Sequence, residues 1–124
     1  MNSKAKGGRG EREWAAFCRS HGFTDAHRGT QFKGGFDSPD VVGLPGIHQE
    51  VKRQERTEIQ KWMAQAIRDS EGKALPIVAH RRNREEWLVT MRADDWFKLY
   101  KGWCIDGILS TDIYDILDGC KNSR

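Results

Sequence analysis

Two carboxylates and one lysine in the middle of the chain have the spacing of a metal-assisted hydrolytic site. Asp40 is followed ten residues later by Glu50, and Lys52 comes two residues further on, beyond an apolar run and the Pro45-Gly46 turn. Side chains along a strand alternate between faces, so Glu50 and Lys52 point to the same side. Pairing across the turn would bring Asp40 beside both. The three groups would then suit a hard divalent cation next to a positive charge, the arrangement that phosphodiester hydrolysis uses.

The same spacing has an ordinary structural explanation. A glutamate and a lysine two residues apart on a strand are often a solvated face with a weak ion pair. The Pro39-Asp40 pair before an apolar strand favours the functional interpretation instead.

Length and composition indicate one ordinary globular domain. The chain has 124 residues, 37% of them hydrophobic and 31% charged. No apolar run approaches the ~20 residues of a membrane span, and the basic N-terminus lacks the apolar core of a secretory signal. Three cysteines, at positions 18, 104 and 120, form no C-x-x-C pair. This pattern is typical of reduced thiols, so we expect a cytoplasmic protein without a disulfide framework.

Positive charge is concentrated in three clusters within a chain of net charge +3. The clusters are Lys4/Lys6/Arg9/Arg12, Lys52/Arg53/Arg56 and Arg81/Arg82/Arg84. A single cluster is usually a solvated loop or helix face. Three clusters in one small domain favour contact with a phosphate backbone.

Hydrophobic periodicity predicts an α/β domain in which a mixed sheet is flanked by helices. The expected helices run over about 8–21, from Thr57 to about 70, and from Asp94 or Asp95 onward, and the expected strands over about 26–28, 40–42, 47–53, 75–80 and 87–91. Thr57 and Gln60 have the form of a capping box. We expect residues 1–7 to be a flexible basic arm, 8–101 the core, and 102–124 a helical extension packed on the core or at a dimer interface.

The order of these elements and motifs resembles the PD-(D/E)-x-K nuclease superfamily, with its restriction-endonuclease-like core. The segment K-G-x-x-x-E-R-E at residues 6–13 and the Gly22-Phe23 pair are similar to those of archaeal-type Holliday junction resolvases. The resemblance covers roughly residues 5–100, and the order and spacing of its short motifs are more specific than any one of them.

The resemblance implies a role for each matching residue. Asp40 would be the main metal ligand, Glu50 and the backbone carbonyl of Val51 further ligands, and Glu11 a helix-borne carboxylate that reaches the site. Lys52 would orient the attacking water or stabilise developing charge. Helix geometry alone leaves Glu11 and Glu13 as alternatives, and the resemblance favours Glu11.

The implied partners are Mg²⁺, with Mn²⁺ able to substitute, and DNA. The resemblance assigns phosphate contacts to Lys4, Lys6, Arg12 and Arg28, and the charge clusters add Arg9, Arg53, Arg81, Arg82 and Arg84. No organic cofactor and no membrane are expected. The family acts as a homodimer on four-way junctions, with the Trp96–Trp103 region and the Ile113–Leu117 stripe as candidate interfaces.

Other functions stay open from the sequence. One is a flap, nicking or restriction-like endonuclease of the same superfamily. The VRR-type nucleases, for example, carry a downstream glutamine. Gln65 could correspond to it, although a glutamine that flanks the apolar stripe is more often a surface residue. Another is a non-catalytic DNA-binding subunit, which the intact Asp40, Glu50 and Lys52 argue against. Asp37 could join the site or be a turn residue, and His48 could touch substrate or be a buried sheet histidine.

Overall fold

The computed structural model describes residues 3–29 and 39–105, with side chains from residue 7 onward. The chain divides into two compact units, residues 1–91 and 92–124. Predictions for the Lys4 and Lys6 side chains, for Asp37 and for the Ile113–Leu117 stripe lie outside the described residues.

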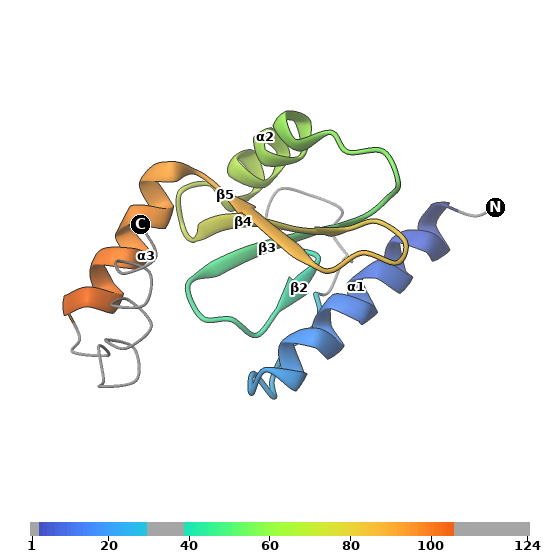
Figure 1. Ribbon diagram of the computed structural model, residues 1–124, viewed down its shortest axis with the longest axis horizontal. Coiled ribbons are helices and arrows are strands. Elements are labelled where there is room, and N and C mark those ends of the chain that lie inside the picture. The colour runs from blue at the N-terminus through green and yellow to red at the C-terminus, as the bar shows by residue number, and fades with distance from the viewer. Residues whose placement is uncertain (1–2, 30–38, 106–124) are drawn as a thin grey trace, which may run out of the picture. The chain divides into compact units, whose positions relative to one another are not determined.

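The first unit is built on a five-stranded mixed sheet (Figure 1). Its elements are α1 (Ser3–Ser20), β1 (His27–Arg28), β2 (Val41–Val42), β3 (Ile47–Arg53), α2 (Ile59–Ser70), β4 (Leu75–Arg81) and β5 (Leu88–Met91), and the strands lie in the order β1-β2-β3-β4-β5. β3 and β4 pair in parallel, as the intervening α2 crossover requires, and the other neighbours are antiparallel. The α/β fold with a mixed sheet and flanking helices is confirmed.

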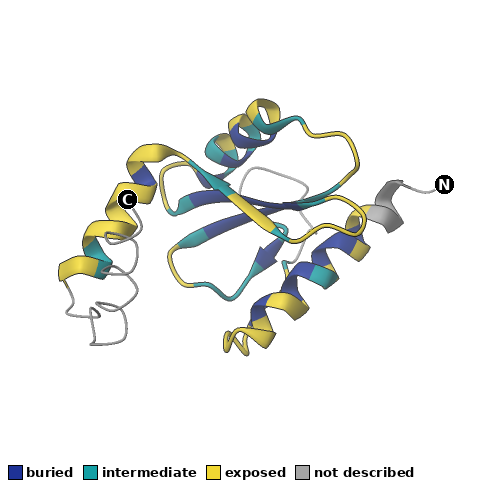
Figure 2. Cartoon of the chain, in the orientation of Figure 1, coloured by how far each residue is buried: buried dark blue, intermediate teal, exposed yellow. Residues whose placement is uncertain are grey.

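Helix α1 covers one face of the sheet. Trp14, Ala15 and Cys18 bury against Val41 and Val51, and the buried side of the helix is visible in Figure 2. The helix ends as the sequence predicts: Gly22 has φ +97°, and the Phe23 amide donates to the Cys18 carbonyl at 3.2 Å. It begins at Ser3, earlier than the expected start near residue 8.

Helix α2 covers the opposite face. Trp62, Met63 and Ala66 pack with Val78 of β4, following the predicted apolar stripe. The predicted capping box is wrong. The helix begins at Ile59, so Glu58 is the N-cap residue and no side chain caps the helix. Thr57 stands one residue too early for its hydroxyl to serve as the cap.

The second unit contains α3 (Ala93–Ile105) in its described part. Asp95 in its first turn pairs with Arg92 at 2.9 Å and with Lys98 at 3.4 Å. The rings of Trp96 and Tyr100 stack with their centroids 5.3 Å apart. Among the described residues, no helix has the length and apolarity needed to span a bilayer.

Candidate active site

Asp40 is fixed at the point where β2 joins the sheet. Its amide donates to the Gln49 carbonyl at 2.9 Å, and its Oδ2 accepts the Val51 amide at 2.8 Å. Val41 pairs with Gln49 in the adjoining antiparallel register. The expected pairing across the Pro45-Gly46 turn is therefore confirmed, and the Asp40 carboxylate lies against the backbone between Glu50 and Lys52.

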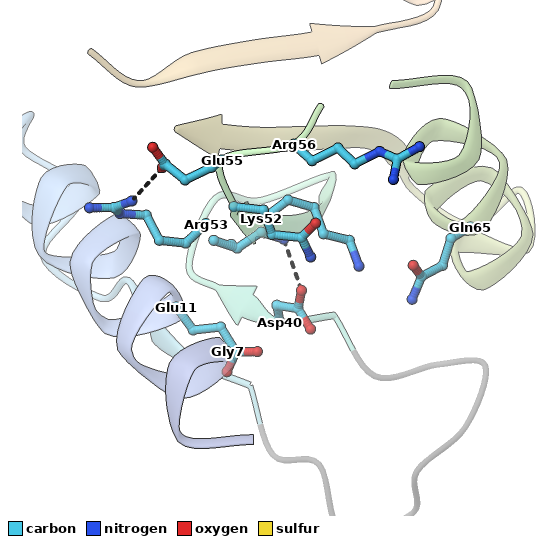
Figure 3. A pocket seen from close by; sticks show the side chains of 10 residues that line it. Gly7, Glu11, Asp40, Lys52, Arg53, Glu55, Arg56 and Gln65 are labelled. Carbon is cyan, nitrogen blue, oxygen red and sulfur yellow. Dashed lines mark hydrogen bonds and ion pairs between the residues drawn. The ribbon is translucent and has the colours of Figure 1, made fainter. Parts of the chain in front are cut away.

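A pocket of about 560 Å³ opens over this point (Figure 3). Its lining residues are Gly7, Glu11, Asp40, Val51, Lys52, Arg53, Gln54, Glu55, Arg56 and Gln65. Figure 3 shows Glu11 from α1, Asp40 just before β2, Lys52 from β3 and Gln65 from α2 directed toward the same space. Glu50 does not line the open pocket, because it is 2% exposed in the face of the sheet that α2 covers.

The Asp40 carboxyl has an unusual electrostatic environment. Burial is the largest influence, and it raises the pKa of Asp40 to about 8, with the charges of Glu50 and Glu11 acting in the same direction. A hydrogen bond with the Glu50 side chain adds to this effect, and the Val51 amide opposes it. Three carboxyl groups on different elements are thus crowded together, which is unfavourable unless a proton or a cation is shared between them.

The donor set fits a hard divalent cation. Within the described residues, no group of three acidic, histidine or cysteine side chains already has the spacing of a metal site. Mg²⁺ needs less than this, since it is commonly bound through one or two carboxylates and keeps several waters. Asp40 and Glu50, with a backbone oxygen such as that of Val51, therefore suffice in number and chemistry.

Gly10 allows α1 to bring Glu11 to this pocket. A Cβ on Gly10 would lie 2.5 Å from the Arg53 Cβ, so the helix crosses the end of β3 at a distance that only glycine permits. Glu11 is 7% exposed and accepts a hydrogen bond from Arg28 Nε at 2.9 Å. The structure thus brings Glu11 to the pocket, as the resemblance implied, and directs Glu13 elsewhere.

The arginines expected to contact DNA fall into separate groups. Arg12 and Arg28 lie at the pocket end of α1, where a Cβ on Gly8 would be 3.3 Å from a guanidinium nitrogen of each. Arg82 pairs with Glu85 on the β4–β5 turn, and Arg84 has the left-handed backbone of a turn residue, with φ +62°.

A third group surrounds Glu13. Arg53 Nε lies 3.0 Å from a Glu13 carboxylate oxygen, Arg81 Nη1 3.5 Å from the same oxygen, and Arg9 Nε 3.6 Å from the other. Three guanidinium groups around one carboxylate leave a net positive patch. Sequence reasoning missed this role of Glu13, because it depends on how α1 crosses β3.

Two further polar residues of β3 are buried, and their hydrogen bonds were not predicted from the sequence; for His48 the structure shows the alternative of a buried sheet histidine. Gln49 is fully buried on the α1 side, where its Oε1 accepts the Trp14 indole N–H at 2.7 Å. His48 is 6% exposed, and its Nε2 lies 2.8 Å from Glu50 Oε1. The alternation of β3 predicted that His48 shares a face with Glu50, but not that the two side chains bond.

The fold and this carboxylate–lysine pocket define a nuclease of the PD-(D/E)-x-K class. The chain is similar to a solved structure of Hjc, a Holliday junction resolvase from the archaeal hyperthermophile Archaeoglobus fulgidus. The two share 27% identity with a TM-score of 0.52, over 69% of this chain and 72% of that one. The chain belongs to the phage putative PDDEXK endonuclease family, whose sequence model matches residues 2–113. No curated protein matched the chain.

Proposed function

We propose that this endonuclease is a Mg²⁺-dependent, structure-specific enzyme that hydrolyses phosphodiester bonds in branched DNA. The observation that carries the proposal is the convergence of Asp40, Glu50 and Glu11 beside Lys52, with the pKa of Asp40 raised first by burial and then by its carboxylate neighbours. A cluster of this kind is stable in its ionised form only with a cation present.

Each side chain has a distinct task in this proposal. Asp40, Glu50 and the Val51 carbonyl would hold the cation, with Glu11 at the edge of its shell. A bound Mg²⁺ or Mn²⁺ would make water more acidic and screen the charge of the phosphate. Lys52 would place its ammonium where negative charge develops on the phosphate during attack.

Substrate binding would rest mainly on phosphate contacts. Arg12 and Arg28 lie next to the pocket, and the group of Arg9, Arg53 and Arg81 around Glu13 would extend the basic surface along the duplex. Because such contacts release counterions, affinity would fall steeply as salt concentration rises.

A Holliday junction is the branched substrate that the similarity to Hjc favours. A four-way junction has two equivalent strands to cut, so we propose a twofold homodimer that presents two sites. A second candidate is a flap, nicking or restriction-like endonuclease. It is favoured by Gln65, which lines the pocket from α2 and could correspond to the downstream glutamine of the VRR-type nucleases.

Cleavage of an end-labelled panel with Mg²⁺ tests the proposal. The panel contains a four-way junction, a flap, a nicked duplex and a linear duplex. We expect paired symmetric cuts in the junction, and sedimentation of a dimer at micromolar concentration. A monomer that cuts linear duplex as well as the junction would exclude the resolvase and leave the second candidate.

A further inference from the structure

His48 and Glu50 form a buried hydrogen-bonded pair within β3. The two side chains point to the same face, and the His48 Nε2 to Glu50 Oε1 distance is 2.8 Å. They are 6% and 2% exposed, respectively. The carboxylate form of Glu50, which metal binding requires, only accepts hydrogen bonds, so in that form His48 Nε2 carries the proton of this bond.

The side chains of β4 that face His48 and Glu50 cannot hydrogen-bond to the Glu50 carboxylate. Across the parallel ladder, Pro76 stands opposite His48 and Val78 stands opposite Glu50, and both are buried. Neither side chain can donate a hydrogen bond. A carboxylate at this depth needs such a partner, because burying an unsatisfied charged group is costly.

His48 and Asp40 approach Glu50 from different sides. Along this face of β3, Glu50 lies between His48, which is buried, and Lys52, which lines the open pocket. Asp40 approaches Glu50 closely enough for their side chains to share a hydrogen bond. His48 therefore holds Glu50 from the protein interior, while Glu50 faces Asp40 on the pocket side.

We propose that His48 is a positioning residue that fixes the rotamer of Glu50 for metal binding. The inference rests on the proposed metal site of Asp40 and Glu50. Occupation of Oε1 by the imidazole N–H leaves Oε2 as the oxygen directed to a cation. It also resists the rotation away from Asp40 that repulsion between the two carboxylates would otherwise cause.

The magnitude follows from what is known of hydrogen bonds behind metal ligands. Removal of such a partner typically costs about 10–100-fold in metal affinity or activity. We expect His48→Leu to weaken Mn²⁺ binding by a factor in this range. His48→Gln places an amide nitrogen near the position of Nε2, and we expect it to stay within about 3-fold of the wild type.

His80 provides a matched control. It is a buried histidine on the neighbouring strand β4, 9% exposed, and its Nε2 lies 2.9 Å from the Thr90 hydroxyl instead of a carboxylate. His80→Leu removes a comparable buried ring and hydrogen bond without touching Glu50. It should lower stability as His48→Leu does, yet leave Mn²⁺ affinity unchanged.

The experiment is a titration of Mn²⁺ followed by the EPR signal of the free ion, with folding checked by circular dichroism. Equal Mn²⁺ affinity in folded His48→Leu and wild-type protein would overturn the inference, as would equal weakening by His80→Leu. If His48→Leu does not fold, His48→Asn takes its place. Its amide corresponds to Nδ1 and misses Glu50, so the same 10–100-fold loss is expected. Failure of the metal site itself would look different, because wild-type protein would then bind Mn²⁺ no better than Asp40→Asn.

Discussion

Replacing Asp40 with asparagine should stabilise the metal-free protein at alkaline pH, even though it destroys the proposed site. The raised pKa means that the folded state retains a proton on Asp40 after the unfolded chain has lost it. The folded state therefore loses stability as the pH rises from about 4 to about 8. Asparagine keeps the shape and the acceptor for the Val51 amide, but it never ionises.

The size of the effect can be bounded from the shift. A pKa raised from 3.8 to about 8, at about 1.4 kcal/mol per unit, gives an upper limit of roughly 4 kcal/mol lost between about pH 5 and pH 8. Asp40 is only half-buried and lines an open pocket, where water screens the charges of its neighbours, so we expect about 1–2 kcal/mol in practice.

Urea unfolding in EDTA at about pH 5 and about pH 8 measures this difference. Burial lowers the pKa of His80, so its contribution has the opposite sign with pH. The His80 contribution is the same in the wild type and in Asp40→Asn, so it cancels when their free energies of unfolding are subtracted. Adding Mg²⁺ should stabilise the wild type and leave Asp40→Asn unchanged. If the free energy of unfolding changed equally with pH in the wild type and in Asp40→Asn in EDTA, the interpretation of crowded carboxylates would be refuted.

Other substitutions test the remaining parts of the site. Lys52→Ala should lower cleavage by about 100-fold or more, with Mn²⁺ affinity unchanged in the EPR titration. Gly10→Ala should lower both stability and cleavage, since its Cβ would lie 2.5 Å from that of Arg53. A Cβ on Gly7 would meet no atom within 4 Å, so Gly7→Ala should instead stabilise α1 by up to about 1 kcal/mol. Equal effects of the two alanines in thermal unfolding would contradict the close crossing. Arg28→Gln should weaken DNA binding and reduce the salt slope by about 1, as measured by fluorescence anisotropy with Ca²⁺ in place of Mg²⁺.

The fold could be predicted largely from local patterns. The alternation of β3 between apolar and polar residues, the stripe of α2 and the left-handed Gly22 are each encoded within a few neighbouring residues. The Pro45-Gly46 turn similarly placed Asp40 against β3. Exact helix ends were predicted less well: α2 begins at Ile59, after an N-cap residue Glu58 whose side chain makes no capping bond, and not at the Thr57 capping pattern.

The site was only partly predictable, since its remaining features depend on contacts distant in sequence. Helix periodicity could not separate Glu11 from Glu13. That choice is made where Gly10 meets Arg53, more than forty residues along the chain. The alternation of β3 predicts that His48 and Glu50 lie on the same face. It does not predict that both are buried there and hydrogen-bonded to each other.

The central claim is that Asp40, Glu50 and Lys52 form the phosphodiesterase site, and single-turnover cleavage tests it most directly. Labelled junction DNA at saturating enzyme is mixed with Mg²⁺ for the wild type and for Asp40→Asn, after equal binding by both has been verified in Ca²⁺. We predict cleavage by the wild type and a rate at least about 100-fold lower for Asp40→Asn. Cleavage by Asp40→Asn at nearly the wild-type rate would contradict the account and place the chemistry elsewhere on the protein.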